Sequence, residues 1–355
     1  MTQTLFTPIT LGKLQLNNRV AMAPLTRCRA IGNVPNELME KYYTQRASAG
    51  LLISEGVAPS ANGMGYARQP GLFTQEQIEG WQHVTSGVHA AGGKIFAQIM
   101  HDGRVCHPAN MLADTKIVAP SAVAAPGEMW TDSEGLKPYP IPHVMTEEDI
   151  QQAIAEFAMA AKNAIAAGFD GIELHGANGY LIDQFLNTAS NQRNDRWGGN
   201  VENRIRFAVE VAKAAVAAIG AEHIGMRISP YGVFNGAVAD EDMDAMYERL
   251  TSELNLLGIV YIHVVDHSSM GAPEVSPTLK ATIRANFKGK YILSGGYDAV
   301  RANADLDANH GDLVAFGRSF ISNSDLVSKM QSGTELTAPD FDTFYTPGEK
   351  GYTDY

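Results

Sequence analysis

The stretch TEEDIQQAIAEFAMAAKNAIAAGFDGIEL, residues 146–174, contains the clearest helix of the sequence, followed directly by a strand. Thr146 can cap the helix, three acidic residues occupy its first turn, and apolar residues then recur on one face. Gly168 suits a helix that ends in a left-handed residue, and the run after it predicts a strand over 168–174. A helix that leads into a buried strand is the unit of a parallel sheet.

The same alternation extends in both directions from this stretch and predicts an α/β fold. Eight strands with crossover helices predict a (β/α)₈ TIM barrel, for which about 250 residues are typical. We expect the 355 residues to form a single domain, although two domains stay an alternative, for which the sequence shows no linker. The predicted strands are 19–23, 50–54, 94–100, 168–174, 223–228, 258–264, 290–293 and 312–316, and further helices are predicted over 201–219, 240–256 and 277–287.

Two segments lie outside the repeat of strands and helices. The first eighteen residues predict a β-hairpin around Gly12 that closes the barrel floor. Residues 101–145 follow the third strand and contain six prolines, which argue against a long helix. Because barrel enzymes keep their sites at the carboxyl ends of the strands, we expect this long loop to form a lid or pocket wall.

Composition and charge exclude several classes of protein. The 27 basic and 39 acidic side chains give a net charge of −12, which repels phosphate backbones and anionic membranes, so no nucleic-acid or membrane partner is expected. The longest nearly apolar stretch, 256–265, is too short to span a bilayer. The N-terminus lacks the features of a signal peptide, and Cys28 and Cys106 are the only cysteines, so we expect a cytoplasmic protein.

A metal site is not expected from the sequence. His101, Cys106 and His107 lie close together on the proline-rich loop, but they match no metal-binding motif.

Polar residues at the ends of several strands indicate a site. Thr26 follows the first strand, Gln98 lies in the third, and Arg227 lies in the fifth. In a barrel these side chains converge on one face. The alternative for Gln98 or Arg227 alone is that it only satisfies another buried polar group.

The fourth strand runs into the segment HGANGY, residues 175–180, which presents His175, Asn178 and Tyr180 together. Donors from histidine and asparagine that meet at one point would polarise a carbonyl or nitro oxygen, and a tyrosine beside them is a candidate proton donor. The alternative is a loop in which the Tyr180 ring packs and His175 caps a carbonyl. The sequence therefore favours a catalytic turn and leaves a structural one open.

The last two predicted strands are followed by glycines and an arginine, a pattern typical of an anion-binding site. Ser294-Gly295-Gly296 follows the seventh strand, and Gly317-Arg318 follows the eighth, where barrels often bind phosphate. Glycines let backbone N–H groups approach an anion, and arginine adds a fixed charge. The alternative is that the glycines only end the strands while Arg318 pairs with a surface acid. These residues predict a phosphate-bearing ligand without choosing between a flavin and a sugar phosphate.

Longer motifs carry a resemblance to a known family. From about residue 5 to the C-terminus the chain contains LFTPITLG, NRVAMAPLTR, SEG, GYARQPGL, GWQHVTSGVHAAGGKIFAQIMHDGR, the whole stretch 168–207, GMRISPYGVF, LSGGY and FGRSFISN. In these motifs, their order and their spacing, the sequence resembles the old yellow enzymes. These are FMN-dependent ene-reductases, also called alkene reductases, and N-ethylmaleimide reductases are among them.

The resemblance implies a non-covalent FMN across the barrel mouth, with NADPH or NADH as hydride donor. His175 and Asn178 would bind the oxygen of an activated alkene, Tyr180 would protonate the carbon, and Tyr66 and Tyr345 would line the substrate pocket. The implied substrates are α,β-unsaturated carbonyls, maleimides, nitroalkenes and nitrate esters, and the implied assembly is a monomer or small homo-oligomer. The implied FMN-binding residues are Pro24, Leu25, Thr26, Gly56, Gln98, Arg227, Gly295, Gly296, Gly317 and Arg318.

Several positions depart from the family pattern. Asn178 stands where many relatives have a second histidine, Met100 where tryptophan is frequent, and Gly56 where alanine is frequent. Residues 265–274 and the segment around Trp130 also differ from the family pattern.

Three alternative functions fit the sequence less well. A dienoyl-CoA reductase or amine dehydrogenase on the same barrel needs an iron–sulfur cluster, and two distant cysteines cannot supply its four thiolates. A Schiff-base aldolase needs a lysine inside the barrel, where the sixth strand offers His263. A flavin-binding protein without turnover is disfavoured because His175, Asn178 and Tyr180 are all present.

Overall fold

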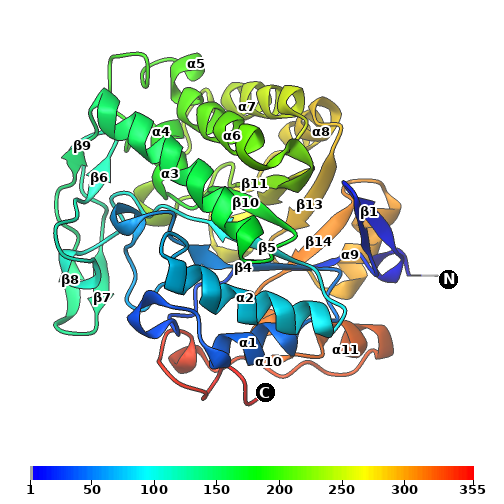
Figure 1. The fold of residues 1–355 in the computed structure, drawn as a ribbon. Helices are drawn as coiled ribbons and strands as arrows, with labels where there is room; N and C mark the ends of the chain where they lie inside the picture. The colour runs from blue at the N-terminus through cyan, green and yellow to red at the C-terminus, as the bar shows by residue number, and fades with distance from the viewer. Residues whose placement is uncertain (1–2) are drawn as a thin grey trace.

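The structure, a computed structural model, describes residues 3–355, within which eight parallel strands close into a barrel (Figure 1). The last strand pairs with the first in parallel and so closes the ring. Each predicted strand overlaps one strand of the barrel, which confirms the (β/α)₈ prediction. In neighbouring order the strands are β3 (Val20–Met22), β4 (Leu51–Val57), β5 (Ile95–Ile99), β10 (Gly171–Gly176), β11 (Ile224–Ile228), β12 (Tyr261–Val265), β13 (Lys290–Ser294) and β14 (Leu313–Phe316).

Helices surround the barrel, and the longer ones bury apolar side chains. In α3 (Glu147–Ala166) the Thr146 side chain accepts from the Asp149 N–H at 3.1 Å, and Asp149 accepts from the Thr146 N–H at 2.9 Å. This reciprocal cap confirms the predicted start of the helix. The other helices are α1 (Glu37–Thr44), α2 (Gln75–Ala90), α4 (Leu181–Leu186), α5 (Val201–Arg204), α6 (Arg206–Ile219), α7 (Met243–Leu257), α8 (Pro277–Asn286), α9 (Ala299–Asp307), α10 (Arg318–Ser322) and α11 (Leu326–Ser332).

Two helix predictions need correction. The helix predicted over 201–219 is two helices, α5 and α6, separated at Ile205. The helix predicted over 240–256 begins only at Met243, in α7. The reason is a tertiary contact, because the acids that would cap it, Asp240 and Asp242, both accept from the buried guanidinium of Arg204.

The N-terminal hairpin closes the floor of the barrel, as predicted. Its strands β1 (Ile9–Leu11) and β2 (Leu14–Leu16) pair antiparallel. Gly12, at the turn, has φ +56°, and a Cβ there would lie 2.9 Å from Val260 Cγ1, just before β12 begins. Figure 1 shows the hairpin at the opposite end of the molecule from β6–β9.

The segment after β5 contains no long helix within the described residues, as the prolines predict, but it is more ordered than a plain loop. In it β6 (Val118–Ala119) pairs with β9 (His143–Val144), and β7 (Glu128–Thr131) pairs antiparallel with β8 (Gly135–Pro138). That residues 101–145 act as a lid, and that 1–355 form a single domain, stay predictions.

Three buried arginines hold the C-terminal residues, which Figure 1 shows beside α1 and α10. Arg27 Nη2 donates to the Gly351 carbonyl at 2.7 Å, and Arg29 and Arg46 donate to further backbone carbonyls between residues 343 and 352. The Tyr352 ring stacks on Tyr42 with centroids 4.0 Å apart. This C-terminal clamp fixes residues 341–345, which form part of the rim of the barrel mouth.

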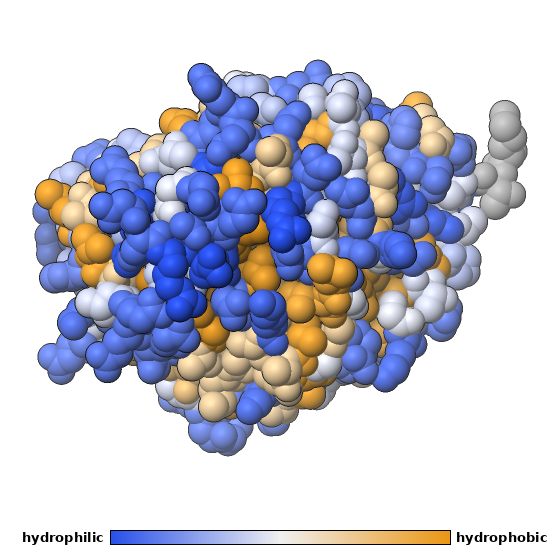
Figure 2. Space-filling model, turned by 90° about the horizontal axis from the view of Figure 1, so that it is seen from above, coloured by the Kyte–Doolittle hydropathy of each residue, from blue (hydrophilic) through white to orange (hydrophobic). Residues whose placement is uncertain are grey.

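Large apolar side chains on the outer surface include Trp130, Ile141, Leu256 and Val300. Figure 2 shows a face that is mostly hydrophilic, with hydrophobic residues gathered in a band near its middle. In the described part of the chain, every helix is too short or too polar to cross a bilayer. The cytoplasmic location stays a prediction.

Candidate active site

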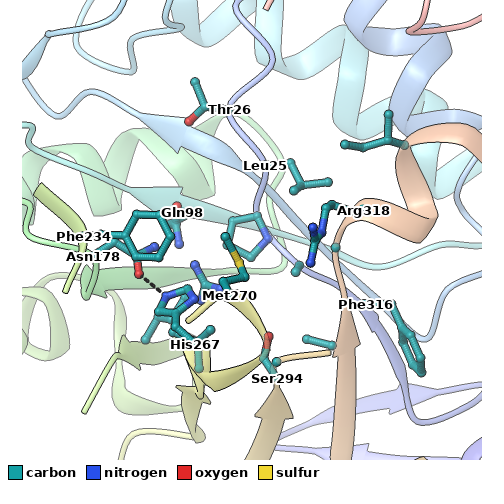
Figure 3. Close-up of a pocket in the computed structure, with 18 of the residues that line it drawn as sticks. Leu25, Thr26, Gln98, Asn178, Phe234, His267, Met270, Ser294, Phe316 and Arg318 are labelled. Atoms are coloured by element: carbon teal, nitrogen blue, oxygen red, sulfur yellow. Dashed lines mark hydrogen bonds between the residues drawn. The ribbon is translucent and has the colours of Figure 1, made fainter. Parts of the chain in front are cut away.

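A cavity of about 600 Å³ opens at the carboxyl ends of the barrel strands (Figure 3). The structure brings together there almost all the residues that the sequence predicts for the site. They are Pro24, Leu25, Thr26, Tyr66, Gln98, His175, Asn178, Tyr180, Arg227, Gly295, Gly296, Gly317, Arg318 and Tyr345.

Gly56 is the predicted site residue that does not line this cavity in the described chain. It lies in β4, and a Cβ there would sit 2.4 Å from Met100 Cε and 2.6 Å from its Sδ. Met100 therefore fills the space that an alanine methyl would take, and it lines the cavity itself. Two of the departures from the family pattern thus form one packing unit.

His175 is oriented by Gln98. The Gln98 Nε2 lies 3.2 Å from His175 Nδ1 and 2.9 Å from Glu173 Oε1. An amide nitrogen can only donate, so Nδ1 accepts and the ring proton sits on Nε2. Burial and the charge of Arg227 lower the pKa of His175 well below its usual value, which keeps the imidazole neutral. The side chain therefore offers one N–H donor, at Nε2.

Asn178 is held at three points. Its φ is +61°, a left-handed conformation that asparagine tolerates. Its N–H donates to Ser229 Oγ at 2.9 Å, and its carbonyl accepts from Asn235 Nδ2 at 2.8 Å. The third contact joins its side-chain Oδ1 to His267 Nε2 at 2.7 Å (Figure 3). With Oδ1 engaged, the amide Nδ2 is the group left for a ligand.

Tyr180 and Tyr66 form a hydroxyl pair. Their Oη atoms lie 2.7 Å apart, and the Tyr180 ring lies 5.1 Å from the His175 ring between centroids. Burial raises the pKa of Tyr180, and the nearby Asp102 raises it further, so the phenol keeps its proton at neutral pH. A protonated hydroxyl therefore stands beside the two N–H donors.

Tyr345 is fixed at the rim through its backbone. Arg68 Nη2 donates to the Tyr345 carbonyl at 2.8 Å, and Arg68 also pairs with Asp132, beyond β7. One arginine thus joins the C-terminal rim to the 101–145 segment.

A buried charged network lies beneath the cavity. Glu173 accepts from Gln98 and from Tyr261 Oη at 3.1 Å, and its Oε2 lies 2.8 Å from His263 Nδ1. Although burial opposes ionisation, His263 and Arg227 hold the pKa of Glu173 below its usual value. The carboxylate therefore balances the positive charge of Arg227 at the cavity wall.

Two of the glycines predicted to bind phosphate, Gly295 and Gly296, leave no room for a side chain, whereas a Cβ on Gly317 would lie 3.6 Å from Leu25 Cδ2, an ordinary contact distance. A Cβ on Gly295 would lie 2.0 Å from the Asp266 carbonyl oxygen, and one on Gly296 would lie 2.7 Å from Ser269 Cβ. Arg318 is exposed and forms no ion pair with residues 3–355, so the surface-acid alternative is not seen. Arg301 Nη1 donates to the Gly295 carbonyl at 3.1 Å and adds a second cation.

The three residues considered for a metal are engaged with the backbone. His101 Nδ1 and His107 Nδ1 each accept a backbone N–H two residues ahead, and Cys106 Sγ donates to the Gly103 carbonyl. Among residues 3–355 no group of three or more His, Cys, Asp and Glu side chains is arranged to hold a metal ion.

Comparison with known proteins identifies the family. The family model described as NADH:flavin oxidoreductase / NADH oxidase matches residues 4–337. The chain belongs to this family. The resemblance to the old yellow enzymes is thereby confirmed, and the protein is an FMN-dependent oxidoreductase with a nicotinamide as hydride donor.

Individual relatives match over nearly the whole chain. A probable flavin mononucleotide-dependent alkene reductase of Leishmania infantum is 43% identical and covers 98% of this chain and 96% of its own. The 12-oxophytodienoate reductase 1 of Oryza sativa subsp. japonica is 40% identical, and the match covers 99% of this chain and 92% of the relative. Among solved structures, morphinone reductase superposes with a TM-score of 0.96 at 42% identity, covering 99% and 96%. The old yellow enzyme homologue from Zymomonas mobilis gives 0.94 at 40% identity, covering 99% of both chains.

Some residues of the site were not predicted from the sequence. The sequence signal for Glu173 is an acidic residue inside a buried strand. His267, Met270 and Phe234 also line the cavity, and no sequence pattern indicates this.

A matched pair of glycine variants tests the phosphate site. Gly296→Ala and Gly333→Ala place a methyl at nearly equal φ, +64° and +69°, but Gly333 has no described atom within 4 Å. Both should lose about 1–2 kcal/mol of stability from the left-handed backbone. Only Gly296→Ala should also weaken FMN binding, by about tenfold or more, because Ser269 must shift. Fluorescence titration of apoprotein with FMN measures this, and equal FMN affinity in the two variants would argue against a phosphate site here.

Proposed function

We propose that this enzyme reduces activated carbon–carbon double bonds in α,β-unsaturated carbonyls, maleimides and nitroalkenes, with nitrate esters as a further substrate class. The observation that carries the proposal is the meeting of three fixed hydrogen-bond donors on one cavity wall. They are His175 Nε2–H, Asn178 Nδ2–H and the Tyr180 hydroxyl.

The cavity has the donors and the space that FMN needs. Arg227 is buried at the wall, and its Nε finds no hydrogen-bond partner among residues 3–355, so an acceptor from a ligand would satisfy it. The phosphate would lie against Gly295, Gly296, Gly317 and Arg318, whose backbone and charge suit an anion. The ring would lie against Pro24, Leu25, Thr26 and Gln98.

Bound there, FMN supplies the hydride that a nicotinamide has given it. His175 and Asn178 would donate to the carbonyl or nitro oxygen of the alkene, where negative charge grows as hydride adds to the β-carbon. Hydrogen bonds to a charged group contribute about 1.5–3 kcal/mol each, more than bonds to a neutral oxygen, so the pair stabilises the transition state over the substrate.

Tyr180 would complete the reaction by giving its proton to the α-carbon. Its raised pKa keeps the proton in place until a strongly basic carbanion is present. The tyrosinate that remains can accept a hydrogen bond from Tyr66 at 2.7 Å. Tyr66 and Tyr345 would also limit which alkenes enter, because both line the cavity near its rim.

A visible spectrum of the purified protein, followed by anaerobic titration with NADH and with NADPH, tests the redox half of this proposal. A flavin spectrum that bleaches with nicotinamide and recovers with 2-cyclohexenone is expected. A yellow protein whose bleached flavin recovers with oxygen but with no activated alkene would contradict the proposed substrate class. The relative rates with the two nicotinamides decide which is preferred.

A further inference from the structure

His267 contacts the proposed substrate-binding residue Asn178 from outside the catalytic turn. It lies on the 3₁₀ helix His267–Met270 that follows β12, and its Nε2 lies 2.7 Å from Asn178 Oδ1. Figure 3 shows the His267 ring pointing to the Asn178 amide at one side of the cavity. The two residues are 89 positions apart in the sequence.

An asparagine amide can turn by 180°, and the two orientations have opposite chemistry. With Oδ1 toward the cavity, Asn178 would repel a carbonyl or nitro oxygen, whereas with Nδ2 toward the cavity it donates to it. The other contacts of Asn178 are through its backbone, to Ser229 and Asn235, so they do not choose between these orientations.

His267 makes this choice when its ring proton is on Nε2. Burial and the charge of Arg227 lower the pKa of His267 to about 4, so the ring is neutral at neutral pH and carries one proton. Donation from Nε2–H to Oδ1 leaves both amide hydrogens of Asn178 free for a ligand.

The His267 ring is itself rigidly supported. It packs against the Phe234 ring with centroids 4.6 Å apart. The preceding Asp266 accepts from the Ser268 N–H at 3.0 Å, pairs with Lys280 at 2.7 Å and donates its own N–H to the Ser294 carbonyl at 2.9 Å. The start of this short helix is therefore tied to the end of β13.

We propose that His267 is a positioning residue, which turns the Asn178 amide so that its N–H groups face the substrate oxygen. The inference rests on the proposed function, because it gives Asn178 the role of a donor. His267 would act through Asn178 alone, so its effect on ligand binding must vanish when Asn178 is replaced.

The test compares FMN-loaded His267→Ala and His267→Gln with the parent, and with His83→Ala, an exposed histidine on α2, as control. The probe is 4-hydroxybenzaldehyde, a phenol that mimics an enolate oxygen, and its Kd follows from the change in the flavin spectrum. His267→Ala should weaken binding by about tenfold, the value of one hydrogen bond. His267→Gln retains an N–H donor and should restore most of the affinity, and His83→Ala should match the parent.

A double-mutant cycle separates positioning from a general packing effect. In an Asn178→Ala background, His267→Ala should add no further loss of phenol affinity. Unchanged affinity of the single His267→Ala variant, or an equal loss in both backgrounds, would overturn the inference. If His267→Ala does not retain FMN, His267→Leu fills the same space without a donor and gives the same comparison.

The parent protein distinguishes the two proposals. A parent that retains FMN but does not bind the phenol would overturn the proposed donor site, and the role of His267 with it. A parent that binds the phenol, with His267→Ala binding equally well, would overturn only the role of His267.

Discussion

Replacing Tyr180 by phenylalanine should slow alkene reduction by about a hundredfold or more, the usual contribution of a positioned general acid. The variant loses only the hydroxyl, because the ring still packs beside His175. Flavin reduction by the nicotinamide should continue near the parent rate, since that half-reaction needs no proton from Tyr180. In the parent, the raised pKa of this phenol should make alkene reduction nearly independent of pH from about 6 to about 9.

Stopped-flow measurement of the two half-reactions, with 2-cyclohexenone as the alkene, checks this expectation. Tyr66→Phe is the matched comparison, because it removes the 2.7 Å partner of Tyr180 while the proposed donor keeps its O–H. It should slow the alkene half by less than about tenfold. If the rate of the alkene half-reaction is unchanged in Tyr180→Phe, Tyr180 does not have the proposed role, whatever the rate in Tyr66→Phe.

Replacing His175 and Asn178 together by alanine should weaken phenol binding by about a hundredfold or more, because two donors to a charged oxygen are lost. The second-order rate constant for alkene reduction should fall by about a thousandfold, as expected when a transition-state donor pair is removed. Both side chains are uncharged donors, because the pKa of His175 is lowered and the Asn178 amide carries no charge. The loss of phenol affinity should therefore not depend on the charge of either residue.

Titration of the FMN-loaded variant with 4-hydroxybenzaldehyde measures the affinity, and the two single variants show how the effect divides between the residues. FMN content and far-UV circular dichroism confirm that the barrel is intact. Matching phenol titrations for the double variant and the parent would show that these donors do not bind the substrate oxygen.

The barrel could be predicted because its signals are local. The start of α3 is determined by Thr146 and Asp149, three residues apart. The strand β10 begins a few residues after this helix ends. Eight such units leave little choice of fold. The site could be predicted for the same reason, since parallel strands bring their carboxyl ends to one face wherever they lie in the sequence.

The parts that could not be predicted depend on contacts between distant side chains. The start of α7 is set by Arg204, which engages the acids that would otherwise cap the helix. Met100 fills the space beside Gly56, and neither residue alone indicates this. The pairing of His267 with Asn178 depends on a loop conformation and a rotamer, which no periodic pattern encodes.

The C-terminal clamp determines which residues at the rim tolerate substitution. Arg27, Arg29 and Arg46 donate to main-chain oxygens, which every amino acid possesses, and the side chains of Phe341 and Tyr345 accept none of these hydrogen bonds. We therefore expect substitutions at those two rim positions to disturb folding little, which leaves them free to change the proposed selectivity of the entrance. Phe341 and Tyr345 thus offer a starting point for laboratory evolution toward bulkier reactants.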